Sequence, residues 1–196
     1  MIYILAGLVL WSLSHGFKRM FPELRNTLGS GARGIVTLGI IIAIALMTLG
    51  YKTAEDIILW QAHDVFWVIN NGLMLVVIYM FGAAGAKTRL SLVMRHPMIN
   101  ATMIWAVAHI LVNGDLASLA LFGGLGAWAY ITRIVVDRDP WEIPNPPSWG
   151  KEIGVMVTSV ILYVGLIHIH DLLGPYPLWW GWPLNGFAAT ILSPFM

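Results

Sequence analysis

Residues 98–136 read MINATMIWAVAHILVNGDLASLALFGGLGAWAYITRIVV, and this stretch decides the fold. Two apolar runs, 98–112 and 116–136, are separated only by Asn113, Gly114 and Asp115, which are residue types typical of tight turns. So short a connection predicts two antiparallel helices that pack on each other. The second run is about as long as the ~20 residues that a helix needs to cross a lipid bilayer. The stretch therefore predicts a transmembrane helical hairpin.

The rest of the chain has the same apolar character. Charged residues make up 11% of the sequence and hydrophobic residues 58%, whereas soluble domains are about 25% charged. Two of the runs, 2–17 and 98–112, are short for a hydrocarbon core about 30 Å thick. We predict an all-α, polytopic transmembrane bundle of about six spans, with residues 1–196 forming a single domain in the lipid bilayer. The four further runs are 2–17, 35–51, 66–86 and 153–173.

Basic residues gather on one side of the predicted membrane. They follow the first, third and fifth runs, and the side of a membrane protein that is richer in Lys and Arg stays in the cytoplasm. This pattern predicts that both termini face away from the cytoplasm. The basic residues are Lys18, Arg19, Arg25 and Arg33, then Lys87, Arg89 and Arg95, then Arg133, Arg138 and Lys151.

Two segments are rich in proline. The connection 137–150 contains four prolines, which exclude a continuous helix and predict an extended cytoplasmic strap. The segment 174–187 reads GPYPLWWGWPLNGF, which is apolar but broken by Pro and Gly. It predicts an interfacial or re-entrant C-terminal segment.

Several classes of site are excluded. Cysteine is absent, so there are no disulfides, thiolate metal ligands or cysteine nucleophiles. The net charge is +1 without a long basic run, which argues against a nucleic-acid partner. Gly123, Gly124 and Gly126 lie inside an apolar run and predict close helix approach rather than a phosphate loop.

Two of the apolar runs carry a histidine with aromatic or polar residues four positions away on either side. A spacing of four keeps each trio on one stripe of a helix. Ionisable residues inside a membrane are costly and mark candidate functional sites. The two trios are Trp11, His15 and Arg19, and Trp105, His109 and Asn113.

Histidine from two apolar helices suggests haem, because neutral imidazole is a common ligand of haem iron. His15 and His109 are the candidate iron ligands, Arg19 could pair with a propionate, and Trp11 or Trp105 could pack on the macrocycle. Ordinary packing also explains the tryptophans, and each histidine could instead bond to a neighbouring helix. Helical rise places His15 about 21 Å and His109 about 13 Å from the outer surface, a mismatch of about 8 Å. Asn113 follows His109 by one turn and could hold it in position.

The remaining histidines lie at the predicted membrane surfaces. His96, just before Pro97, should lie at a depth similar to His15 and is its rival as a ligand. His63, His168 and His170 are interpreted as ordinary interfacial residues. His168 and His170 point about 200° apart on a helix, so both cannot serve one metal.

The stretch from Arg95-His96-Pro97 through the Trp105, His109 and Asn113 stripe to Trp128 resembles the core signature of the NnrU family. The first run, with Ser14-His15 and Arg19, is similar to the opening of that family. The resemblance implies a multi-pass protein of the bacterial inner membrane that is associated with denitrification, and the loop charges would then place both termini in the periplasm.

The NnrU family is related to the plant 15-cis-ζ-carotene isomerase, a haem b membrane enzyme. That relation implies that His15 and His109 are the axial pair and that His96 is a motif residue of undefined role. The isomerase has a cysteine three residues before its second ligand, whereas this chain has Ala106 there, so a thiolate ligand switch is impossible.

These observations lead to an expected function and two alternatives. The first expectation is a haem b membrane protein that supports denitrification or nitrogen-oxide redox metabolism. The second is a haem-dependent cis–trans isomerase of a carotenoid-like polyene. The third is an assembly or haem-delivery factor for a nitrite or nitric oxide reductase.

Overall fold

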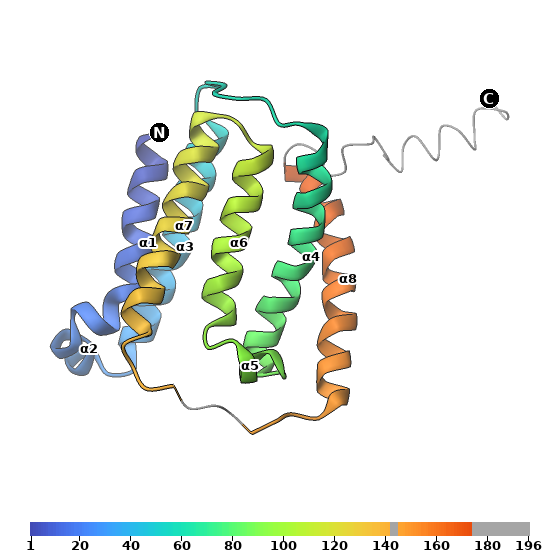
Figure 1. The fold of residues 1–196 in the computed structure, drawn as a ribbon. Helices are drawn as coiled ribbons and strands as arrows, with labels where there is room; N and C mark the ends of the chain where they lie inside the picture. Colours follow the sequence, from blue (N-terminus) through green and yellow to red (C-terminus); the bar gives the residue numbers. More distant parts are fainter. Residues whose placement is uncertain (142–144, 174–196) are drawn as a thin grey trace, which may run out of the picture.

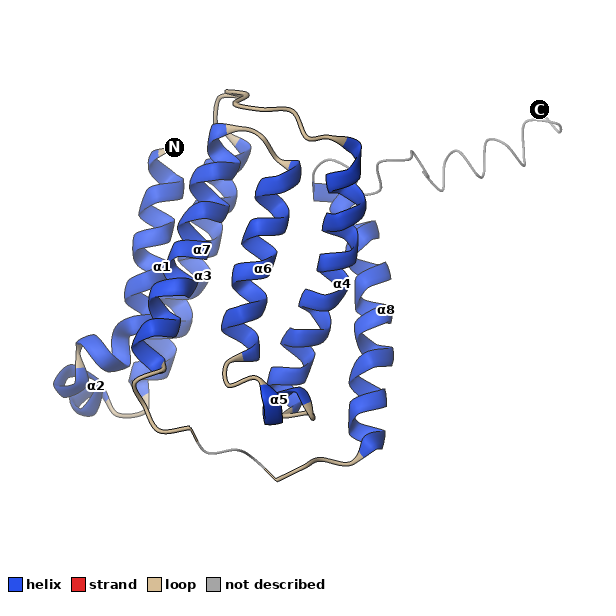
Figure 2. Ribbon diagram, in the orientation of Figure 1, coloured by secondary structure: helices blue, strands red, loops and turns tan. Residues whose placement is uncertain are grey.

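The computed structural model describes residues 1–141 and 145–173, and the side chains of all of these except 171–173. The described part of the chain is α-helical and contains no strand (Figure 2). The all-α prediction is therefore confirmed for this part. Its helices are α1 (Ile2–Met20), α2 (Pro22–Leu28), α3 (Gly31–Lys52), α4 (Asp64–Ala86), α5 (Leu90–Val93), α6 (Pro97–Val112), α7 (Leu116–Val136) and α8 (Trp149–Leu173).

Helix α6 occupies the middle of the bundle (Figure 1). It packs on α7 and on α4, whereas α1 packs mainly on α3, and α8 packs on α4. We call the end of the bundle that holds residues 113–115 the turn end, and the end that holds α2, α5 and residues 137–141 the strap end. The N-terminus lies at the turn end (Figure 1).

Among the described residues, four helices are long and apolar enough to cross a membrane, which identifies a multi-pass membrane protein. The sequence predicted about six spans. Helix α6 is apolar but has only 16 residues, because the turn at 113–115 ends it early. Helix α1 is longer than predicted, ending at Met20, but its last turn contains Lys18 and Arg19. The four spans are Gly31–Lys52, Asp64–Ala86, Leu116–Val136 and Trp149–His170.

The predicted hairpin of α6 and α7 is confirmed. Asp115 caps α7, accepting a hydrogen bond of 2.7 Å from the backbone N–H of Ser118 to its Oδ1. A Cβ atom on Gly126 would lie 3.1 Å from the Cβ of Ala106, so α7 approaches α6 closely at this point. A Cβ atom on Gly124 would meet the side chain of Leu8 on α1, so Gly124 and Gly126 serve helix packing as predicted, whereas one on Gly123 would meet only Leu119 of its own helix.

The α3–α4 connection covers the α6–α7 turn. The backbone N–H of Leu59 donates to the carbonyl oxygen of Gly114 at 2.7 Å, and the N–H of Leu116 donates to that of Ile57 at 2.9 Å. Ile58 and Asp115 form an isolated antiparallel bridge. Two segments far apart in the sequence therefore form one layer over the turn end.

The start of the strap is held by Arg95. Its guanidinium donates to the carbonyl oxygens of Val136 and Asp137, at 3.0 Å each. Residues 137–141 and 145–148 are not helical, as the prolines predicted. The predicted interfacial or re-entrant segment lies outside the described residues.

The other end of the strap is held by a buried carboxylate. Glu152, which is 7% exposed, accepts a hydrogen bond of 2.7 Å from the backbone N–H of Arg89 and another from the hydroxyl of Tyr79. The Arg89 guanidinium lies 4.2 Å from the centre of the Trp149 ring. These contacts attach the first turn of α8 to α4.

Replacing Glu152 with alanine is expected to lower the free energy of unfolding by about 2–4 kcal/mol, because two partly buried donors lose a charged acceptor that is itself buried. The midpoint of thermal unfolding in detergent measures this effect. Glu23→Ala, an exposed change on α2, is the matched control and should leave the midpoint unchanged. Equal midpoints for the two variants would contradict the role assigned to Glu152.

Candidate cofactor-binding site

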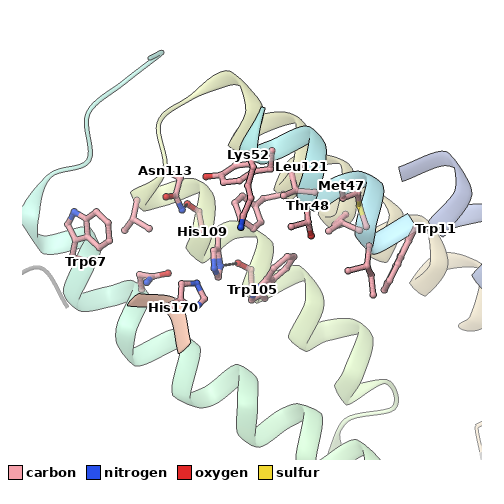
Figure 3. A pocket seen from close by; sticks show the side chains of 16 residues that line it. Trp11, Met47, Thr48, Lys52, Trp67, Trp105, His109, Asn113, Leu121 and His170 are labelled. Atoms are coloured by element: carbon pink, nitrogen blue, oxygen red, sulfur yellow. Dashed lines mark hydrogen bonds between the residues drawn. The ribbon is translucent and has the colours of Figure 1, made fainter. Parts of the chain in front are cut away.

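A cavity of about 560 Å³ lies toward the turn end, lined by side chains from α1, α3, α4, α6, α7 and α8 (Figure 3). Its lining is mostly apolar and aromatic. Its volume is within the range of about 300–1,000 Å³ that is common for pockets holding small molecules and cofactors. The aromatic, charged and amide-bearing residues of the lining are Trp11, Tyr51, Lys52, Trp67, Asn70, Trp105, His109, Asn113, Phe122 and His170.

His109 presents one ring nitrogen for binding. Its Nδ1 lies 3.0 Å from the carbonyl oxygen of Trp105, and since a carbonyl only accepts, Nδ1 carries the proton. In the neutral ring the lone pair is then on Nε2, the form in which histidine ligates metals. The Asn113 amide donates to the carbonyl oxygen of His109 at 2.8 Å, which secures the last turn of α6. Trp105, His109 and Asn113 all line the cavity.

His170 comes close to His109. The two ring centroids are 6.4 Å apart, with an angle of 45° between the planes (Figure 3). The sequence had suggested an ordinary interfacial residue at this position. The sequence does indicate that His170 and His109 both lie near the turn ends of their helices. It does not indicate which helix α8 packs against.

His15 lies elsewhere. Its ring is exposed and packs 4.1 Å from the ring of Trp11 and 4.9 Å from that of Trp128, and it does not line the cavity. His109 instead packs on Phe122, with centroids 4.5 Å apart. Phe122 and Trp128 are separated along α7 by about 9 Å of helical rise. The two histidines therefore lie at different depths, consistent with the mismatch predicted from the sequence.

Polar atoms without partners occur on the cavity lining. Trp11 Nε1 and Asn70 Oδ1 are buried without a hydrogen-bond partner among the described residues, and both side chains line the cavity. Buried polar groups are usually satisfied, so such atoms suit polar substituents of a ligand. Lys52 is the one charged residue of the described lining and suits a carboxylate.

Arg19 and His96 lie at the strap end and do not line the cavity. Arg19 forms an ion pair with Asp139, and this guanidinium holds the pKa of the Asp139 carboxyl below its usual range. His96 Nε2 lies 3.2 Å from Asp137 Oδ1. The Arg19 guanidinium is thus paired within the protein, and its pairing with a propionate stays a prediction.

His96 is expected to make stability fall in acid. Burial lowers its pKa from 6.5, the nearby Asp137 opposes this effect, and Arg95 and Arg133 add to it. The unfolded chain therefore takes up a proton near pH 6.5 before the folded protein does, so stability is lost as pH falls below that value. Between pH 7.5 and 5.5 the unfolding midpoint of the wild type should fall further than that of His96→Gln. His168→Gln controls for the loss of an exposed imidazole, and identical slopes for wild type and His96→Gln would refute the expectation.

A bare metal ion would find few ligands here. Within the described residues, no group of three or more His, Cys, Asp or Glu side chains is close enough to hold one. Two imidazoles leave most coordination positions of an ion empty, whereas a porphyrin brings four nitrogens of its own. The donor set therefore fits haem better than a free ion.

A family profile described as NnrU protein matches residues 3–177, which is most of the chain. No curated protein and no solved structure matches it.

Proposed function

The chain belongs to the NnrU family, and from this premise we propose that it is a haem b-binding protein of the bacterial inner membrane that supports nitrogen-oxide redox metabolism. Bound haem supplies a one-electron redox centre, and the protein orients and insulates it. The observation that carries the proposal is His109, whose Nε2 lone pair is available in an apolar cavity of about 560 Å³.

Other residues of the cavity have roles in this proposal. Trp105 holds the tautomer of His109 through its carbonyl oxygen, which is 3.0 Å from Nδ1. Its indole and that of Trp11 offer flat apolar surfaces for the macrocycle. Lys52 would pair with a propionate, because it is the cation on the described part of the cavity lining.

The orientation of the bundle follows from its charges. Cytoplasmic loops of membrane proteins carry an excess of Lys and Arg. We propose that the strap end faces the cytoplasm and that the turn end, with the N-terminus and the cavity, faces the periplasm. The basic residues at or near the strap end include Lys18, Arg19, Arg25, Arg33, Arg89, Arg95 and Arg133.

The absorption spectrum of the purified protein tests the cofactor. After expression with ample haem and purification in detergent, we expect a Soret band that co-elutes with monodisperse protein and a pyridine haemochrome spectrum of haem b. Monodisperse protein without a Soret band, even after titration with haem, would refute haem binding.

Growth tests the metabolic role. A deletion strain should grow slowly on nitrate or nitrite without oxygen and normally with oxygen, and the wild-type gene should restore growth. Equal growth of both strains would contradict the role. Co-purification of a nitrite or nitric oxide reductase would favour the assembly or haem-delivery function.

The apolar lining also favours a second candidate, a haem-dependent cis–trans isomerase of a carotenoid-like polyene. A polyene would be buried by the same aromatic and aliphatic side chains. Incubating the reduced protein with a cis-carotenoid and separating the isomers tests this function. An unchanged isomer ratio counts against it.

A further inference from the structure

We propose that His109 and His170 would together hold the haem iron, so that α8 rather than α1 would supply the second imidazole. This inference rests on the proposed haem binding. It differs from the pairing of His15 with His109 that the family resemblance implied.

The separation of the two rings carries the argument. A metal–nitrogen bond of about 2 Å places an imidazole centroid about 3 Å from the metal, so two imidazoles on opposite sides of one iron have centroids about 6 Å apart. The centroids of His109 and His170 are 6.4 Å apart. The separation of the two centroids thus matches the spacing that one iron requires.

Both rings also face the same space. His109 and His170 line one cavity, from α6 and α8, and the Nδ1 of His109 is already occupied by the carbonyl oxygen of Trp105. The ring of His168, two positions earlier on α8, turns away and donates from Nδ1 to the carbonyl oxygen of Val164 at 2.7 Å. His168 is therefore a natural control for His170.

His15 is a poorer partner by the same criteria. Its ring lies against the indoles of Trp11 and Trp128, outside the cavity lining. His15 contacts Trp128 of α7, and His109 contacts Phe122 of the same helix. These two positions are separated by about 9 Å of helical rise, so the two histidines lie at different levels of the bundle. Joining His15 to His109 through one iron would require α1 to slide along the bundle.

Iron bound in this way would connect α8 to the centre of the bundle. Helix α8 packs on α4, and its attachment by Glu152 is at the strap end. The His170 bond would hold its turn end against α6. Haem should therefore reduce hydrogen exchange in the last turns of α8, an effect that is independent of any catalytic activity.

The test compares ferric spectra and low-temperature electron paramagnetic resonance of detergent-purified, haem-saturated proteins. The wild type should be six-coordinate and low-spin. His170→Ala should become high-spin and return to low-spin with added imidazole, and His170→Met should give a shifted low-spin spectrum. His168→Ala and His15→Ala should match the wild type.

The remaining outcomes of these spectra contradict either the inference or the proposed function. A low-spin His170→Ala protein, or a high-spin His15→Ala protein, overturns the inference, and so does a wild type that binds haem in a high-spin form. A wild type that binds no haem refutes the proposed function instead. Size-exclusion profiles identify any variant that fails to fold, and His170→Met then decides the ligand.

Discussion

Replacing His109 with glycine is expected to weaken haem binding by more than about 100-fold, since losing even an outer-shell partner of a metal ligand costs 10–100-fold. The substitution removes the imidazole whose Nδ1 is 3.0 Å from the carbonyl oxygen of Trp105 and whose Nε2 is free for iron. What remains is the cavity lining, with Lys52 and His170, but without the bond from His109 to the iron. Titration of haem into detergent-purified protein, followed by the Soret band, measures the change.

Added imidazole separates ligand loss from misfolding. The glycine variant leaves a space where the ring was, so millimolar imidazole should enter it and restore the Soret band. His168→Gly removes an exposed histidine from α8 and should bind haem like the wild type. If His109→Gly binds haem with wild-type affinity, His109 is not a ligand of the iron.

The helices were predictable because apolar run length and turn residues report on local structure. The short turn at 113–115 predicted the α6–α7 hairpin, and prolines predicted the irregular strap. The number of spans was less certain, because a run of apolar letters does not locate helix ends. Helix α1 continues through Lys18 and Arg19 to Met20, and α6 is limited to 16 residues by its turn.

Part of the cavity was predictable from spacing alone. Residues four apart share a helix face, and Trp105, His109 and Asn113 all line the cavity. The same spacing in α1 was less informative, because only Trp11 of its trio is on the lining. Periodicity identifies the residues on one face of a helix but not the neighbour that this face meets.

His170 shows what the sequence leaves open. Helix α7 and the irregular strap lie between α6 and α8 in the sequence. The position of α8 along its neighbours in the bundle therefore depends on tertiary contacts. Those contacts include Glu152 with Arg89 and Tyr79 at the strap end. No local pattern in the sequence predicts that they bring His170 to within 6.4 Å of His109.

Stability should be sensitive to substitution of Gly114 at the turn end, because the backbone of Gly114 is in direct contact with the α3–α4 connection. A Cβ atom on Gly114 would overlap the carbonyl oxygen of Trp60 and lie 2.7 Å from its carbonyl carbon. Backbone atoms cannot turn aside as a flexible side chain does. Gly114→Ala should therefore separate the two segments and lower the free energy of unfolding by about 3 kcal/mol.

Separating the two segments should also disturb the cavity. Asn113 adjoins Gly114, and its amide donates to the carbonyl oxygen of His109 at 2.8 Å. We expect a lower thermal midpoint together with weaker haem binding. Gly72→Ala is the matched control, because a Cβ atom there meets nothing within 4 Å, and it should leave both properties intact. If the Gly114 and Gly72 variants unfold at the same temperature, the close contact over the turn does not contribute to stability.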